Sequence, residues 1–112
     1  MDWLARTAHC AAIFFILVGL ATAQAPAGSI IGVVRDPSGA AVPDAHVEAV
    51  SSATALARTI VTSSEGDFSF PALPAGEYEV RVEVPGFQST IRHADVEAGT
   101  TTKADFTLRV AT

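Results

Sequence analysis

Two histidines, His46 and His93, are the first candidates for metal chemistry in the chain after residue 23, whereas the third, His9, lies before that point. A zinc site needs His, Cys or carboxylate ligands that are held close together. Neither histidine has a Cys or a second His near it in the sequence, and His46 falls on an outward position of an alternating segment. We therefore interpret both as solvated side chains and predict no zinc site.

Acidic residues bracket two predicted turns, Asp36 with Asp44 at one and Glu65 with Asp67 at the other. Oxygen-rich loops can bind Ca²⁺, but the spacing here does not match an EF-hand. Asp in turns usually bonds nearby backbone groups instead. We therefore predict no metal site and no cofactor.

Serine and threonine are abundant, but none lies in a nucleophile-elbow motif or beside a plausible base. The sequence therefore predicts no catalytic residue and no enzymatic activity. Sugar binding would need exposed aromatic rings, and the only Trp, Trp3, precedes the predicted domain. The five aromatic residues of that domain are all expected in its core or at a corner: Phe68, Phe70, Tyr78, Phe87 and Phe106.

Residues 1–23 have the pattern of an export signal. Arg6 precedes an apolar run over residues 11–20, and Ala21-Thr22-Ala23 supplies a small-residue cleavage site before Gln24. The alternative is an uncleaved membrane anchor, but the run is shorter than the ~20 residues that a spanning helix needs. We expect residues 24–27 to form a tether and residues 28–112 to form one domain.

The charge balance argues against some partners. The chain has seven Lys and Arg residues against twelve Asp and Glu residues, a formal charge of −5, and the two signs are interspersed. Nucleic acids and anionic lipid surfaces are therefore not expected as partners. The only cysteine, Cys10, lies in the predicted signal, so the domain must fold on a packed core without a disulfide.

About seven short strands are predicted after the signal, separated by turn residues. Strict alternation over residues 77–84 indicates a strand with one buried face, and residues 28–35, β-branched on both faces, indicate a central or doubly covered strand. The remaining strands are expected at 45–50, 58–62, 68–70, 88–93 and 102–110. This pattern predicts an all-β fold, a seven-stranded antiparallel Greek-key β-sandwich.

The stretch over residues 66–87 organises the predicted sandwich. Pro71 and Pro74 are expected to end the strand that carries Phe70 and to form a stiff corner. Tyr78 is expected to form a tyrosine corner, in which its hydroxyl bonds an upstream backbone group. The predicted core is Ile30, Val34, Val47, Val61, Phe68, Phe70, Leu73, Tyr78, Val80, Val82, Phe87, Ile91, Phe106 and Leu108, with Ala104 and Val110 also facing inward.

The order and spacing of several short motifs resemble the carboxypeptidase regulatory-like domain, a transthyretin-like (prealbumin-like) sandwich. These motifs are the segments 28–36, 38–39, 42–47, 62–70, 73–78, 85–87 and 105–108. One departure is Asp44, where the family usually has Gly. Asp tolerates turn conformations and is expected to fit. In similar adhesin sandwiches a Lys–Asn isopeptide bond forms, but this sequence has no Asn and Lys103 is its only lysine, which leaves only an Asp as a conceivable partner.

The resemblance implies a non-catalytic accessory domain. The turn at residues 36–40 and the segment 71–76 look most like the module that follows the signal peptide of bacterial TonB-dependent outer-membrane receptors. The implied location is the periplasm or outer membrane of a Gram-negative bacterium, with protein partners that include outer-membrane receptor components. The alternative is a small carbohydrate- or peptide-binding module. Edge strands offer a general mechanism for protein contact.

Overall fold

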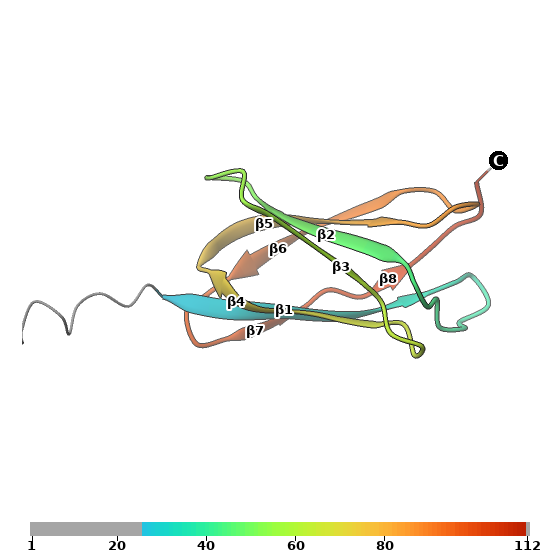
Figure 1. Ribbon diagram of the computed structural model, residues 1–112, viewed down its shortest axis with the longest axis horizontal. Helices are drawn as coiled ribbons and strands as arrows, with labels where there is room; N and C mark the ends of the chain where they lie inside the picture. The colour runs from blue at the N-terminus through green and yellow to red at the C-terminus, as the bar shows by residue number, and fades with distance from the viewer. Residues whose placement is uncertain (1–25, 112) are drawn as a thin grey trace, which may run out of the picture.

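The computed structural model describes residues 26–111, so the predicted export signal lies outside the described residues. Over that range the chain forms two sheets that stack face to face, with no helix (Figure 1). The first sheet contains β1 (Ala27–Arg35), β4 (Asp67–Pro74), β7 (Thr101–Lys103) and β8 (Phe106–Thr107). The second contains β2 (His46–Ser51), β3 (Ala57–Val61), β5 (Gly76–Glu83) and β6 (Thr90–Val96).

The order of the strands confirms the predicted all-β sandwich. The second sheet runs β3-β2-β5-β6 and is antiparallel throughout. In the first sheet β1 is central, antiparallel to β4 on one side and parallel to β7 and β8 on the other. The parallel pairing differs from the expected antiparallel order. It arises because the turn at residues 97–100 carries the chain from β6 in one sheet to β7 in the other.

The core lies between the two sheets and is filled by residues that alternate along the strands. Its buried members include Ile30, Val34, Val47, Phe68, Phe70, Leu73, Tyr78, Val80, Val82, Phe106 and Leu108, as predicted. Ala104 is buried as well, as predicted, and five smaller residues are buried that the prediction left out: Val42, Ala45, Ala49, Ala94 and Val96. Three of the five are alanines, which take up little volume between the larger side chains.

Three residues placed in the core by the sequence are exposed. Val61 is 53%, Ile91 43% and Val110 60% exposed, and Phe87 is only partly buried at the edge of the core. Val61 pairs with His46 and Ile91 with Arg81, both of which point outward, so these two apolar residues share the outer face. A shift of one residue in a strand moves a side chain to the opposite face, which explains the error.

The segment after Phe70 also differs from the prediction. Strand β4 continues through Pro71 to Pro74 instead of ending before the prolines. It can do so because β4 is at the sheet edge, where a missing N–H breaks no ladder bond. The strand is irregular there, with a φ of 54° at Ala72 and a register shift opposite residues 28–30 of β1. The tyrosine corner is confirmed, since the Tyr78 hydroxyl donates to the Pro74 carbonyl at 2.6 Å.

The predicted last strand is divided into β7 and β8. Ala104 N–H still donates to Ile31 O at 2.8 Å, and Leu108 N–H donates to Arg35 O at 2.8 Å. Between them, the Asp105 side chain accepts the Val33 N–H at 3.1 Å in place of a backbone carbonyl. Asp105 therefore fills the gap in the ladder, which lets Ala104, Phe106 and Leu108 face the core as predicted.

Candidate functional site

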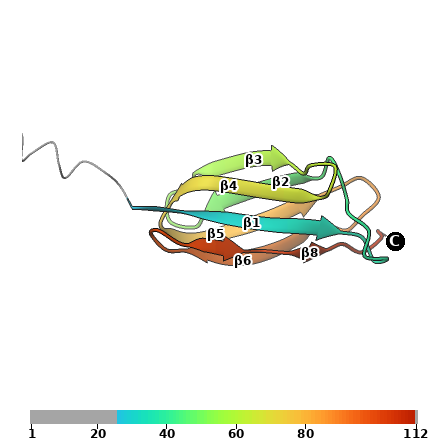
Figure 2. The same ribbon diagram turned by 90° about the horizontal axis from the view of Figure 1, so that it is seen from below.

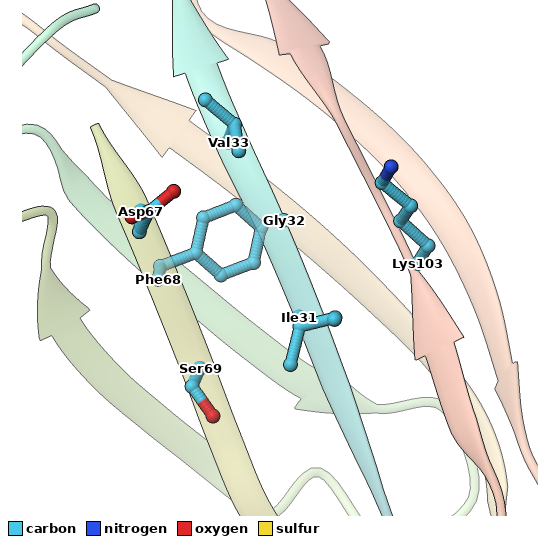
Figure 3. A pocket seen from close by; sticks show the side chains of 7 residues that line it. All are labelled: Ile31, Gly32, Val33, Asp67, Phe68, Ser69 and Lys103. Carbon is cyan, nitrogen blue, oxygen red and sulfur yellow. The ribbon is translucent and has the colours of Figure 1, made fainter. Parts of the chain in front are cut away.

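The outer face of the first sheet carries a shallow groove of about 370 Å³ (Figure 3). Its floor is formed by the outward side chains of Ile31 and Val33 on β1, with β4 on one side and Lys103 of β7 on the other. Ile31 is 39% exposed although it lies on the central strand. The prediction that β1 is central is confirmed, but its outer face is left open by the rest of the described chain.

Gly32 determines how the floor of the groove is built. Its missing side chain points inward, where a Cβ atom would lie 2.0 Å from Ala104 O and 2.5 Å from Cζ of Phe68. The Phe68 ring therefore lies directly against the backbone of β1, as Figure 3 shows. Phe68 also packs edge-on against Phe70, with ring centroids 6.0 Å apart, so an aromatic pair lies beneath the groove.

The rim of the groove is polar. Lys103 Nζ lies 3.6 Å from an Asp105 carboxylate oxygen, and both side chains are well exposed, at 70% and 49%. Asp67 and Ser69 form the opposite rim on β4. An exposed ion pair of this kind contributes little to stability. The groove thus has an apolar floor, with Lys103 on one side and Asp67 and Ser69 on the other.

The structure keeps the two histidines apart and exposed. His46 faces Glu83 across β2 and β5, whereas His93 faces Glu79 across β5 and β6. His46 lines a second shallow hollow of about 300 Å³, together with Glu48, Thr59, Arg81 and Glu83. Among residues 26–111, no group of three His, Cys, Asp or Glu side chains is placed to hold a metal ion.

The acidic turn residues take part in backbone bonding. Asp36 Oδ1 accepts hydrogen bonds from the Ser38 hydroxyl at 2.6 Å, from Ser38 N–H at 2.9 Å and from Ala40 N–H at 3.0 Å. The Ser38 hydroxyl, helped by these backbone groups, holds the pKa of Asp36 below its ordinary value of 3.8. Asp44 adopts a φ of 57°, which is the conformation that Gly would supply at this position.

The second acidic turn is organised by a serine instead. The Ser63 hydroxyl accepts the N–H groups of Glu65 at 3.3 Å and Asp67 at 3.2 Å. Gly66 closes the turn by donating to Ser63 O at 2.9 Å with a φ of 79°. Neither carboxylate is needed to explain this loop, whose geometry follows from the Ser and the Gly.

The aromatic residues are committed to packing. Phe68, Phe70, Tyr78 and Phe106 are buried, and Phe87 packs partly buried against the core. Lys103, the candidate for an isopeptide bond, lies at the surface beside Asp105 as an ion pair. Among the described residues, therefore, the rings and the lysine that could have served a ligand or a cross-link have structural surroundings that account for them.

Two polar residues are buried among the described ones, Ser51 and Thr62, and the role of Thr62 was not predicted. Thr62 is 3% exposed, and its hydroxyl donates to Val42 O at 2.7 Å while accepting the Ala45 N–H at 2.9 Å. It fixes the extended loop before β2 against the end of β3. The only sequence signal was a single Thr after three alternating strand residues, which is too common a pattern to indicate this role.

A family model for the carboxypeptidase regulatory-like domain matches residues 29–109. The chain belongs to this family. The match covers both sheets and the groove, and the family is of a regulatory, non-catalytic type. No curated protein matches the sequence. No helix among residues 26–111 is long and apolar enough to span a membrane.

Several solved structures share the fold at low identity. The Bacillus anthracis TIE protein matches with a TM-score of 0.66 and 18% identity over 77% of this chain and 17% of its own. A candidate carbohydrate-binding protein from Pseudomonas aeruginosa matches with a TM-score of 0.60 and 18% identity, over 79% of this chain and 92% of its own.

An enzyme is also among the similar structures. Catechol 1,2-dioxygenase from Acinetobacter sp. ADP1 matches with a TM-score of 0.65 and 12% identity over 81% of this chain. The chain spans 55% of the length of that dioxygenase, and thus corresponds to part of it. At these identities the likeness describes the sandwich and says nothing about a shared activity.

Proposed function

We propose that this chain is an exported, non-catalytic interaction domain of the periplasm or outer membrane, similar to the N-terminal module of TonB-dependent receptors. The observation that carries the proposal is a regulatory-type sandwich with an apolar outer groove, over Ile31 and Val33, that lies open within the described residues. A groove with an apolar floor and a polar rim is typical of a surface that contacts another protein.

Two sequence features support the location. The leader over residues 1–23 has the three parts of an export signal, and the segments 36–40 and 71–76 resemble the receptor module. The interspersed charge and the formal charge of −5 favour a solvated domain with a protein partner over one that binds nucleic acid.

The proposal that the domain has no catalytic activity is supported by its side chains. The described residues hold the aromatic rings in the core and place His46 and His93 on separate strand pairs. The likeness to catechol dioxygenases extends to the fold of part of those enzymes. These observations favour contact with a partner as the role of the domain.

Fractionation of a Gram-negative host that expresses the chain with a C-terminal tag tests the location. We expect the tagged chain in the periplasmic or outer-membrane fraction, with an N-terminus at Gln24. A chain that stays in the cytoplasm with residues 1–23 attached would contradict the proposal. A matched control replaces Ala21 and Ala23 with Leu, which removes the small residues that a signal peptidase needs and should leave the leader attached.

A second candidate function is binding of a carbohydrate. It is favoured by the fold shared with the candidate carbohydrate-binding protein from Pseudomonas aeruginosa, of which this chain covers 92%. The buried positions of four aromatic residues count against it. Titration of a glycan array with the purified chain separates the two functions, because saturable binding that is lost on replacing Lys103 or Ser69 would favour the carbohydrate.

A further inference from the structure

The edges of the two sheets differ in their capacity to accept another strand. The β4 edge contains Pro71 and Pro74, which have no N–H to donate. The edges formed by β6 and by β7 with β8 are bonded to each other, since Thr102 Oγ1 donates to Asp95 O at 2.7 Å and Arg92 donates to Asp105 O. In Figure 2, β3 lies along the rim of the molecule beside β4, at the opposite side from β6 and β8.

The backbone groups of β3 that face outward can be assigned from the bonds at its two ends. Thr62 N–H donates to Ala45 O at 3.0 Å, and Ser51 N–H donates to Leu56 O at 2.8 Å. Bonded and non-bonded pairs alternate in an antiparallel ladder, so residues 56, 58, 60 and 62 bond β2. The N–H and C=O groups of residues 57, 59 and 61 consequently point away from the sheet.

These three outward residues form a self-complementary set centred on Thr59. A two-fold axis beside Thr59 places Ala57 opposite Val61 of the second copy and Thr59 opposite its own equivalent. Each of these pairs can exchange two backbone hydrogen bonds. All the free N–H and C=O groups of Ala57, Thr59 and Val61 are then satisfied at once.

We propose that two copies of this chain associate through β3, antiparallel and about this axis, to form one continuous sheet of eight strands. The side chains on the outer face of β3 carry no charge, so the pairing sets no like charges opposite each other. Val61, 53% exposed in the single chain, becomes covered by Ala57 of the second copy. The charged residue of the strand, Arg58, is on the inner side, where its Nη1 donates to Pro71 O at 2.8 Å.

A second copy fits this edge because the same strand supplies both sides of the pairing and its outward side chains, Ala57, Thr59 and Val61, bring no charge to it. The inference rests on the edge of β3 and stands whether or not the domain serves an outer-membrane receptor. An interface of this length is small, so we expect a weak dimer with a dissociation constant in roughly the micromolar-to-millimolar range.

Analytical ultracentrifugation of the purified chain, up to about 1 mM, tests the pairing with Thr59→Pro and Thr59→Val. The proline removes an N–H that points outward, so it blocks the edge but leaves the β2–β3 ladder intact. Valine keeps the N–H and the β-branched shape. We expect Thr59→Pro to raise the dissociation constant at least about tenfold and Thr59→Val to change it less than about twofold.

Hydrogen exchange tests whether Thr59→Pro weakens the dimer at the edge of β3 without disturbing the β2–β3 ladder. The Ile60 amide, which bonds β2, should stay protected in both variants. In the parent chain and in Thr59→Val, the amides of residues 57, 59 and 61 should become more protected as the protein concentration rises. In Thr59→Pro, the remaining amides of Ala57 and Val61 should not. A parent chain that is monomeric at about 1 mM overturns the inference. So does a dimer that Thr59→Pro leaves unchanged, and a strand from another protein then becomes the occupant to test.

A charge pair at the two-fold centre tests the register. Thr59→Lys and Thr59→Glu each place like charges opposite one another in a homodimer, which is unfavourable, while a mixture places opposite charges there. We expect each variant alone to dimerise more weakly than the parent, and the equimolar mixture to recover the dimer. A mixture that dimerises no better than either variant alone contradicts a two-fold axis at Thr59.

Discussion

Replacing Thr62 by Val tests whether a buried hydroxyl or the apolar core holds the loop before β2. Valine has nearly the same shape and the same β-branch, so it fills the site without a cavity. It removes the hydrogen bond to Val42 O at 2.7 Å and the bond from Ala45 N–H at 2.9 Å. Ala45 is fully buried and Val42 nearly so, which keeps water from replacing the lost partner.

The expected size of the effect follows from these two bonds. A buried backbone group left without a partner costs about 1–3 kcal/mol, so two of them cost about 2–6 kcal/mol. The extra buried methyl group of valine offsets about 1 kcal/mol of this. Thr62→Val should therefore lower the free energy of unfolding by about 1–5 kcal/mol, a large part of the stability of a domain this small.

Thr62→Ser is the matched control, because it keeps the hydroxyl and loses one methyl group, at a cost of about 1 kcal/mol. Urea unfolding followed by circular dichroism gives the order of stability, provided that the m-value stays constant. The hydrogen-bond account predicts parent, then Ser, then Val. If burial of apolar surface were decisive, Val would be at least as stable as the parent and Ser the weakest, and that order would refute the reasoning.

Three further changes have defined outcomes. Tyr78→Phe removes the 2.6 Å bond to Pro74 O and should cost about 1 kcal/mol in urea unfolding, because the freed carbonyl lies near solvent; an unchanged midpoint would mean that the tyrosine corner adds no stability. Gly32→Ala should destabilise by about 1–3 kcal/mol or more, since its Cβ would lie 2.0 Å from Ala104 O, and a neutral result would show that the backbone moves freely there. The pKa of Asp36, measured by NMR, should lie below 3.8 and should rise in Ser38→Ala. The Asp36 carboxylate therefore stabilises the folded state fully at a pH above its pKa in the unfolded chain, and this stabilisation is lost as the pH falls through its pKa in the folded chain. An Asp36 pKa at or above 3.8 in the parent chain would contradict the bonding described for the turn.

Local patterns in the sequence were enough to predict the sandwich, most of its core and the tyrosine corner. The alternation over residues 77–84 places Tyr78, Val80 and Val82 inward because a strand has a period of two residues. The same rule misplaces Val61 and Ile91, since an apolar side chain on a half-open sheet can lie on either face. Hydrophobic type alone does not determine the face.

The features that the sequence did not predict depend on contacts distant along the chain. Asp105 replaces a backbone carbonyl for Val33, 72 residues earlier, and Thr62 bonds a loop 17–20 residues before it. Neither role leaves a local pattern. The groove at Ile31 was hidden for the same reason, because a strand with β-branched residues on both faces reads as covered on both sides unless its neighbours are known.

Site-specific photocrosslinking in a Gram-negative cell tests most directly whether the domain works by protein contact. A photoreactive side chain at Ser69 lies on the rim of the groove, and one at Glu79 lies on the outer face of the other sheet as a matched control. The account predicts an adduct with an outer-membrane or periplasmic protein from Ser69 and a much weaker one from Glu79. Equal adducts from both positions, or none from Ser69, would contradict it.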